Sequence, residues 1–218
     1  MKKILLSLSL LTLTTSAFCQ KMTAGFCLDE YKECLCMASH FKDFPGIDSI
    51  YFTPKPQQFE RQWISPVVGF DNQWELWQSK DSILAISIRG SIVTPVSWMG
   101  NFHAGMVPAT GHYTLGKRFE YTLCNDSEAC VHAGWLGGML CLSESIIHKI
   151  DSCHKEGYYD FIITGHSQGG AIATLLTAYL RYRQANGLLS SKIRFKTYCS
   201  AAPKAGDYVL ACHYEHMT

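Results

Sequence analysis

The sequence predicts an α/β fold, with a mostly parallel sheet and helices on both of its faces. Between residues 83 and 200, apolar segments typical of strands alternate with amphipathic segments typical of helices. The helical segments are long enough for the crossover connections that parallel strands require. A glycine-rich turn at residues 165–169 also joins one apolar strand directly to the helix that follows it. These features favour a buried sheet covered by helices.

Each element is predicted from its hydrophobic spacing and from the residues that end it. Residues 83–88 have apolar side chains on both faces, as expected for a buried strand. Gly157 and the Asn186-Gly187 pair stop the two longest helices. In chain order, the expected elements are a helix over 24–41, strands over 74–78 and 83–88, a helix over 136–156, a strand over 161–164, a helix over 170–184 and a strand over 193–200.

The N-terminus has the pattern of an export signal. Two lysines follow the initiating methionine, residues 4–13 form an apolar core, and small residues favour cleavage after Cys19. We therefore expect a signal peptide over 1–19 and a secreted, extracellular or periplasmic protein. A lipid-anchored Cys19 is disfavoured, because Phe18 stands where a small residue is expected. The apolar run is shorter than the ~20 residues of a membrane-spanning helix, so no transmembrane segment is expected.

Residues 20–218 are enough for one sizeable core, and one domain is expected. The formal net charge is +1 and the 19 basic residues are spread along the chain, which excludes a nucleic-acid partner. Ten cysteines, nine of them after Cys19, fit an oxidising compartment. The most plausible disulfide joins Cys124 and Cys130 across a turn-prone stretch. An odd count leaves at least one thiol without an internal partner.

Metal binding is a competing use of the cysteines. Cys34, Cys36 and His40 lie close together in the sequence. One residue between two cysteines is poor spacing for zinc, and no second ligand pair stands at a usual interval. No metal and no other cofactor is expected.

The turn at residues 165–169 reads Gly-His-Ser-Gln-Gly, a G-x-S-x-G pattern. The pattern alone is weak, but an apolar strand precedes it and an alanine-rich helix follows it, which is the context of a nucleophile elbow. The glycines are expected because strand and helix approach too closely there for a Cβ. Ser167 is therefore the expected nucleophile. The alternative is an ordinary serine in a glycine-rich turn that holds an anion, but this explains the glycines and not the serine.

Residues 164–171 resemble the elbow of the fungal-type, or class 3, triacylglycerol lipases, where the usual sequence is T-G-H-S-L-G-G-A. The one departure is Gln168 in place of leucine. Three further stretches are similar to family motifs in the same order. Residues 86–91 resemble a strand ending in R-G-T or R-G-S, residues 131–135 resemble V-H-x-G-F, and residues 202–207 resemble G-x-P-R-V-G-N.

The resemblance covers about residues 74–207 and implies the α/β-hydrolase fold. A serine nucleophile needs a base and also donors that stabilise the oxyanion. The elbow places the backbone N–H of Gln168 as one oxyanion-hole donor. The resemblance implies that Ser91 provides the other, through its backbone N–H and its hydroxyl; the alternative is a plain strand-end serine. The resemblance also implies structural roles for His166 and His132. Arg89 is expected to make a structural ion pair or a backbone contact.

Residues after Ser91 have the pattern of a short helix, with Thr94 as its cap and Pro95 at its first position. The resemblance places a lid over the active serine here. An equally weighted alternative is a set of core residues under a long loop. The apolar residues in question are Val96, Trp98, Met99, Phe102, Met106 and Val107.

The acid and the base of the triad are missing from the matched motifs. Their order in this fold is serine, acid, histidine, and in the family both lie beyond the stretch that matches residues 202–207. Asp207 with His213 or His216 has the right order, but the pair would share one loop and Asp207 matches a non-catalytic position. We therefore interpret the domain as truncated at its C-terminus, and we expect the 218-residue chain to be inactive by itself.

The predicted function is that of a secreted carboxylic ester hydrolase. The resemblance implies a lipase that acts on glycerolipids through a serine acyl-enzyme, at a lipid–water interface. The alternative is a non-catalytic secreted binding protein that keeps the hydrolase scaffold.

Overall fold

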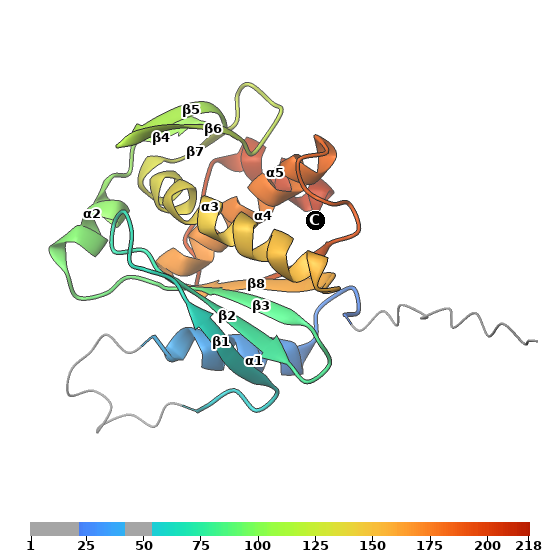
Figure 1. Ribbon diagram of the computed structural model, residues 1–218. Helices are drawn as coiled ribbons and strands as arrows, with labels where there is room; N and C mark the ends of the chain where they lie inside the picture. The colour runs from blue at the N-terminus through green and yellow to red at the C-terminus, as the bar shows by residue number, and fades with distance from the viewer. Residues whose placement is uncertain (1–21, 42–53) are drawn as a thin grey trace, which may run out of the picture.

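A five-stranded sheet in the order β1-β2-β3-β8-β9 forms the centre of the computed structural model (Figure 1). The structure describes residues 22–41 and 54–218, so the expected signal peptide over 1–19 lies outside the described residues. β3, β8 and β9 pair in parallel, whereas β1, β2 and β3 pair antiparallel. The strands are β1 (Phe59–Ile64), β2 (Trp74–Ser79), β3 (Leu84–Ile88), β8 (Asp160–His166) and β9 (Arg194–Ser200).

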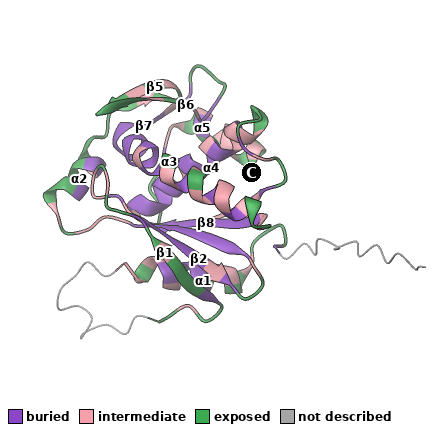
Figure 2. Cartoon of the chain, viewed as in Figure 1, coloured by how far each residue is buried: buried purple, intermediate pink, exposed green. Residues whose placement is uncertain are grey.

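The predicted α/β class is confirmed, although the sheet is mixed and is parallel only over the half that contains the glycine-rich turn. The central strands are buried on both faces because helices cover both (Figure 2). Alternate residues of a strand point to opposite faces. Ile86 and Ile163 therefore join the core under one helical layer, and Ala85 and Ile162 join a second cluster on the other face.

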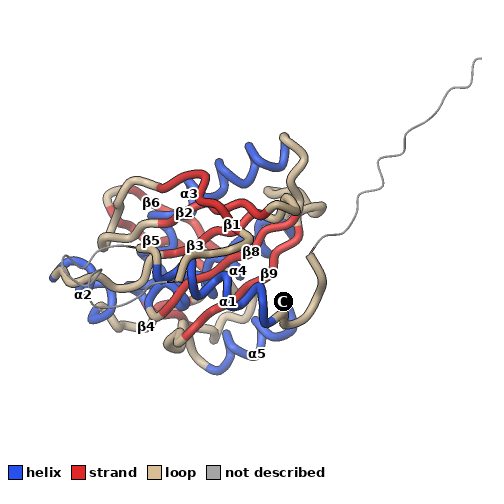
Figure 3. Tube along the Cα trace, turned by 90° about the horizontal axis from the view of Figure 1, so that it is seen from below, coloured by secondary structure: helices blue, strands red, loops and turns tan. Residues whose placement is uncertain are grey.

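Two long helices, α3 (Ala133–Lys155) and α4 (Gln168–Ala185), form the layer on one face. α1 (Leu28–Ser39) lies on the other face, against β3, β8 and β9 (Figure 3). α3 begins three residues before the expected start at residue 136. The reason is that the His132 side chain accepts a hydrogen bond from the Trp135 N–H and caps the helix there.

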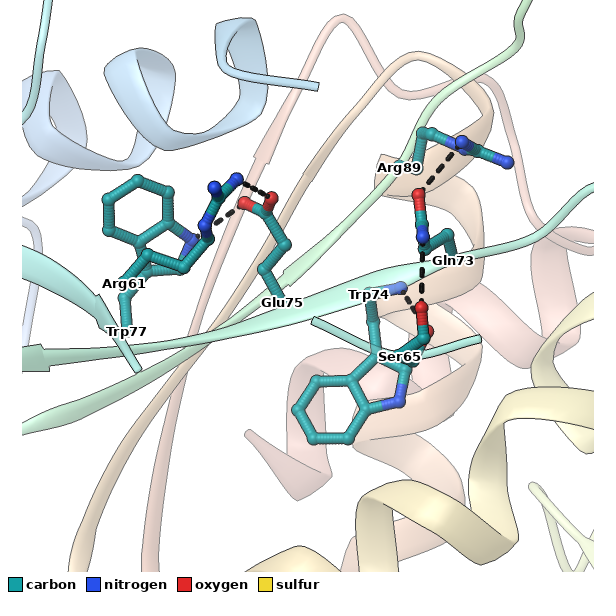
Figure 4. A network of polar contacts seen from close by, with 7 residues as sticks. All are labelled: Arg61, Ser65, Gln73, Trp74, Glu75, Trp77 and Arg89. Atoms are coloured by element: carbon teal, nitrogen blue, oxygen red, sulfur yellow. Dashed lines mark hydrogen bonds and ion pairs between the residues drawn. The ribbon is translucent and has the colours of Figure 1, made fainter. Parts of the chain in front are cut away.

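A cluster of polar contacts holds α1 on the sheet. Lys196 Nζ donates to Glu30 Oε2 at 2.5 Å, and the Tyr198 hydroxyl donates to the same oxygen at 2.7 Å. The Cys27 backbone N–H donates to the Tyr198 hydroxyl at 2.9 Å. At the opposite edge of the sheet, Arg61 pairs with the buried Glu75 carboxylate at 2.6 Å (Figure 4). Burial raises the pKa of that carboxylate, while the Arg61 guanidinium opposes the shift.

Several elements were not predicted from the sequence. They include β1, the hairpin of β5 (Thr110–Leu115) and β6 (Lys117–Thr122), and the short pair of β4 (Met106–Pro108) with β7 (Cys130–His132). The prediction that Asp207, His213 and His216 share one loop is wrong. His213 and His216 lie in α5 (Tyr208–Met217), and Asp207 is the N-cap of that helix, where its carboxylate accepts from the Leu210 N–H.

The nine cysteines among the described residues are all free thiols. The expected disulfide between Cys124 and Cys130 is not formed. Cys124 is fully buried and its sulfur accepts from the Asp126 N–H, whereas the Cys130 sulfur lies beside the Glu128 carbonyl on β7. Across the described parts of the chain, no helix is long and apolar enough to cross a membrane.

Candidate active site

Ser167 stands at the turn between the last residue of β8 and the first residue of α4. Its backbone has φ 54° and ψ −126°. This φ lies in the left-handed range, which residues other than glycine rarely adopt. Such a conformation costs on the order of 1–3 kcal/mol and persists only where its surroundings fix it. Here the Ser167 N–H donates to the Ser200 carbonyl at 3.0 Å, and the Ser167 carbonyl accepts from the Gly170 N–H at 2.9 Å. The half-buried serine is thus held at the apex of a strained turn.

Two glycines make this turn possible. A Cβ on Gly165 would lie 2.3 Å from the carbonyl carbon and oxygen of Gly169. A Cβ on Gly169 would lie 2.3 Å from the Ile88 carbonyl oxygen and 3.0 Å from the Arg89 carbonyl carbon. All these neighbours are backbone atoms, so no side chain could move to make room. The sequence-based reason for the glycines, close approach of strand and helix, is the reason found in the structure.

The loop after β3 lies directly beside Ser167. β3 and β8 are parallel, with Ile88 paired to Gly165, so their C-terminal ends meet at one edge of the sheet. A Cβ on Gly90 would lie 3.9 Å from the Ser167 Cβ. The Ser91 hydroxyl lies 3.3 Å from Oε1 of Gln168, the residue next to Ser167. The structure therefore brings together all three predicted site residues, Ser167, Ser91 and Gln168.

The arrangement offers a hydroxyl with backbone donors beside it. Gln168 is the first residue of α4, and the first N–H groups of a helix have no partner within the helix. These N–H groups also lie at the positive end of the helix dipole. A hydroxyl on such a turn, with a free N–H following it, is what acyl transfer through a tetrahedral oxyanion requires.

The other two sequence motifs pair with each other. Val131 forms an antiparallel bridge with Gly206, and the His132 N–H donates to the Ala205 carbonyl at 3.0 Å. The Asp207 carboxylate accepts from the Cys130 N–H at 2.8 Å and also caps α5. Both Asp207 oxygens therefore have structural partners.

His132 has a structural place next to this pair. Its Nδ1 accepts from the Trp135 N–H at 3.3 Å, so Nε2 carries the proton and donates to the Asn101 carbonyl at 3.2 Å. Its ring also stacks on the Trp135 indole, with centroids 3.7 Å apart. Burial lowers the pKa of His132, and the neighbouring His103 lowers it further. Burial and the acceptor role of Nδ1 both favour the neutral imidazole, while the hydrogen bond to the Asn101 carbonyl opposes the lowering of the pKa.

His166 and His213 have other hydrogen-bond partners. His166 is exposed, and its Nδ1 lies 2.9 Å from the Ser200 hydroxyl. His213 Nε2 contacts the Tyr182 hydroxyl at 2.5 Å. In residues 22–41 and 54–218, no hydrogen bond joins a histidine to the Ser167 hydroxyl.

Arg89 is buried, and its guanidinium lies against the Gln73 side chain (Figure 4). Its guanidinium donates to the Asp71 carbonyl and, at 2.8 Å, to the Gln73 side chain. The Asp71 carboxylate in turn accepts from the Thr94 hydroxyl at 2.6 Å. Arg89 is therefore connected through Asp71 to the helix that follows Ser91.

That helix is α2 (Pro95–Phe102), and its Thr94 cap and its first-position proline are as predicted. Only Ser97 and Gly100 on it are buried, because they face the elbow and α3. Its apolar side chains point to solvent instead of forming a core. Their exposed fractions are 42% for Val96, 47% for Trp98, 58% for Met99 and 76% for Phe102, and the following Met106 is 50% exposed.

Sequence reasoning missed the polar contacts under α2. The Gln168 side chain is only 2% exposed and reaches both Ser91 and the Ser97 carbonyl. Asn101 donates to the Ser91 hydroxyl. The signal that could have revealed this cluster was the amide at position 168, the single departure from the elbow sequence of the resembling family.

Comparison of sequences finds lipases. The family model described as Lipase (class 3) matches residues 85–218. Secreted mono- and diacylglycerol lipase 1 of Fusarium solani is 27% identical over 126 residues, which are 57% of this chain and 31% of that protein. Triacylglycerol lipase OBL1 of Ricinus communis is 28% identical over 126 residues, 51% of this chain and 23% of that protein. The match spans less than a third of the length of these two relatives.

Comparison of structures gives the same fold. A fungal lipase solved with an inhibitor aligns with a TM-score of 0.64 at 18% identity, covering 87% of this chain and 67% of that one. The native Rhizomucor miehei lipase propeptide complex aligns with a TM-score of 0.60 at 18% identity, covering 87% and 57%. At such low identity the likeness concerns the fold alone, and it confirms the predicted α/β-hydrolase fold.

We predict that Gly169→Ala destabilises the protein by more than about 3 kcal/mol, beyond the usual 1–3 kcal/mol of an overpacked site, because the new Cβ meets backbone atoms. Unfolding in denaturant measures this. Gly105→Ala is the matched control, since its Cβ would meet no atom within 4 Å, and it should change stability by less than about 0.5 kcal/mol. Equal midpoints for the two variants would contradict the close approach at the elbow.

Proposed function

This chain belongs to the class 3 lipase family, and from that premise we propose that the protein is a carboxylic ester hydrolase with Ser167 as its nucleophile. The observation that carries the proposal is the strained backbone of Ser167 at the strand-to-helix turn. Strained backbone conformations cluster at active sites, and here the strain falls on the serine between β8 and α4, which supports an enzyme. The enzyme is therefore favoured over the non-catalytic alternative.

In the proposed reaction, the Ser167 hydroxyl attacks the ester carbonyl and a base accepts its proton. The backbone N–H groups of Ser91 and Gln168 donate to the oxyanion that forms. One such donor typically contributes about 10²–10³ in rate. The alcohol leaves with a proton from the base, and water then hydrolyses the acyl-enzyme.

We propose that the acid and the base come from sequence outside residues 1–218. Within the described ranges, the candidate groups already have other partners. Asp207 caps α5, His213 contacts Tyr182 and His166 contacts Ser200. The 218-residue chain by itself is therefore proposed to be inactive.

The proposed substrate is a glycerolipid, met at a lipid–water interface after secretion. The two named relatives are lipases of mono-, di- and triacylglycerols, and one of them is named as secreted. The exposed apolar side chains of α2 lie next to the loop of Ser91 and form a surface suited to contact with lipid. The export pattern at the N-terminus, two lysines followed by an apolar run, supports secretion.

We predict that a fluorophosphonate probe labels Ser167 in the protein extended to its natural stop codon. Ser167→Ala should abolish the labelling, because among the described residues no other serine directly joins a strand to a helix. Ser39→Ala, an exposed serine at the end of α1, is the control and should be labelled like the wild type. Mass spectrometry of the labelled peptide measures both. Label retained by Ser167→Ala would reject the assignment.

Residues 20–218 should hydrolyse p-nitrophenyl esters at least about 10³-fold more slowly than the extended protein, because loss of a triad base removes most of the rate enhancement. Initial rates at equal concentrations of the two proteins measure the difference. A rate for the short chain within about tenfold of the longer one, or 1.4 kcal/mol in barrier, would place a base inside this sequence.

We predict that hydrolysis by the extended protein rises sharply once a short-chain triacylglycerol exceeds its solubility. Trp98→Ala should weaken that rise, because the indole is one of the exposed apolar groups on α2. Tyr208→Ala on α5 is the control, an 81% exposed aromatic residue outside α2, and should keep the rise. A smooth saturation curve that Trp98→Ala leaves unchanged would count against an interfacial role of α2.

A further inference from the structure

The Gln168 side chain is a polar group buried at the centre of the proposed site. It is 2% exposed, and it replaces the leucine that the resembling family has at this position. A buried amide must find hydrogen-bond partners, because an unpaired one costs about 1–3 kcal/mol. The described structure provides two: the Ser91 hydroxyl, 3.3 Å from Oε1, and the Ser97 carbonyl, 3.5 Å from Nε2.

Ser91, Asn101, Gln168 and their partners Trp135 and Ser97 form a chain of hydrogen bonds. The two groups at its ends fix which atom donates in each bond. The Trp135 indole can only donate, so its Nε1–H at 3.0 Å selects the Oδ1 side of Asn101. The Asn101 Nδ2 then faces the Ser91 hydroxyl and donates to it at 2.8 Å. At the other end, the Ser97 carbonyl can only accept, so the Gln168 Nε2 must face it.

The Ser91 hydroxyl lies between these two amides, and among the described residues the Gln168 side chain is the acceptor within its reach. Asn101 donates to its oxygen, and Gln168 presents an acceptor oxygen. The Ser91 proton therefore points at Gln168 Oε1. In this arrangement the hydroxyl is not available to a developing oxyanion.

The position of α2 sustains this arrangement. A Cβ on Gly100 would lie 2.9 Å from the Gln168 Nε2, so the glycine leaves the space that the amide occupies. The Ser97 hydroxyl accepts from the Ile92 N–H at 3.1 Å, which ties α2 to the residue after Ser91. The two contacts of Gln168 are also the longest of the cluster, so they are the weakest and the first to break if Ser97 moves.

We propose that the Gln168 side chain is a positioning group that couples α2 to the oxyanion hole, holding the proton of the Ser91 hydroxyl while the Ser97 carbonyl binds its amide and releasing it when Ser97 moves away. The proposal rests on the proposed function. In this proposal Gln168 has two roles. Its backbone N–H donates to the oxyanion, and its side chain controls whether the Ser91 hydroxyl can donate as well.

A double-mutant cycle in the extended protein tests this coupling. Ser91→Ala is made in the wild type and in Gln168→Leu, and kcat and KM are measured with a soluble p-nitrophenyl ester. In the wild type, Ser91→Ala should lower kcat by less than about threefold. In Gln168→Leu, where the hydroxyl is free to donate, the same change should lower kcat by tenfold or more with KM nearly unchanged. Equal losses in both backgrounds, within about twofold, would overturn the proposal.

Gln168→Met is the matched variant, because it also lacks the acceptor oxygen but has a different shape. It should reproduce the Gln168→Leu result, and a Ser91 effect confined to leucine would mean repacking and overturn the proposal. The unfolding midpoint of each variant shows that the fold is kept.

A measurement that needs no activity tests the link to α2. Amide hydrogen exchange of the peptide over residues 95–102 should quicken by about 3- to 10-fold in Gln168→Leu, the range expected for loss of one net hydrogen bond. Unchanged exchange would overturn the link. If wild-type Ser167 is not labelled by the fluorophosphonate, the proposed function fails, while the exchange result still decides whether Gln168 holds α2.

Discussion

The close approach of three backbone segments at the elbow is the constraint on which the rest of the site depends. The start of α4 lies so near to β8 and to the end of β3 that no Cβ fits at Gly165 or Gly169. The same approach places the loop of Ser91 against Ser167. Because the sheet is parallel at this point, both strands deliver their C-terminal ends to one edge. The position of every predicted site residue follows from this contact.

The central elements could be predicted because their physical signals are local. The hydrophobic periods lie within the strands and helices that they define, and Gly157 and the Thr94-Pro95 pair lie at the ends of their helices. β1 and the β5–β6 hairpin were not predicted, since most of their residues are exposed or half-buried and few large apolar side chains mark these strands. The antiparallel pairing of β1 and β2 depends on tertiary contact as well. The burial of Cys124 in the core could not be predicted either, because no spacing in the sequence indicates it.

At the site, sequence motifs identified which residues meet but not how their side chains are used. Ser167 and Ser91 were found from the elbow and from the strand end. The contacts of Gln168 were not, because its partners lie 77 and 71 positions away along the chain. The two side-chain contacts of Asn101, to Ser91 and to Trp135, were not predicted either. A side-chain amide has donor and acceptor ends, and only the fold decides what each end meets.

Two local rules are broken in this molecule within one turn of chain. Ser167 adopts a backbone conformation that favours glycine, and Gln168 places an amide where a leucine would bury more cheaply. Two contacts of 3.3 and 3.5 Å offset the burial of that amide only in part, because both exceed the usual hydrogen-bond length. Selection for stability alone would replace both residues. Both residues lie where β3, β8 and α4 meet. Such local violations are expected at an active site, where function can outweigh stability.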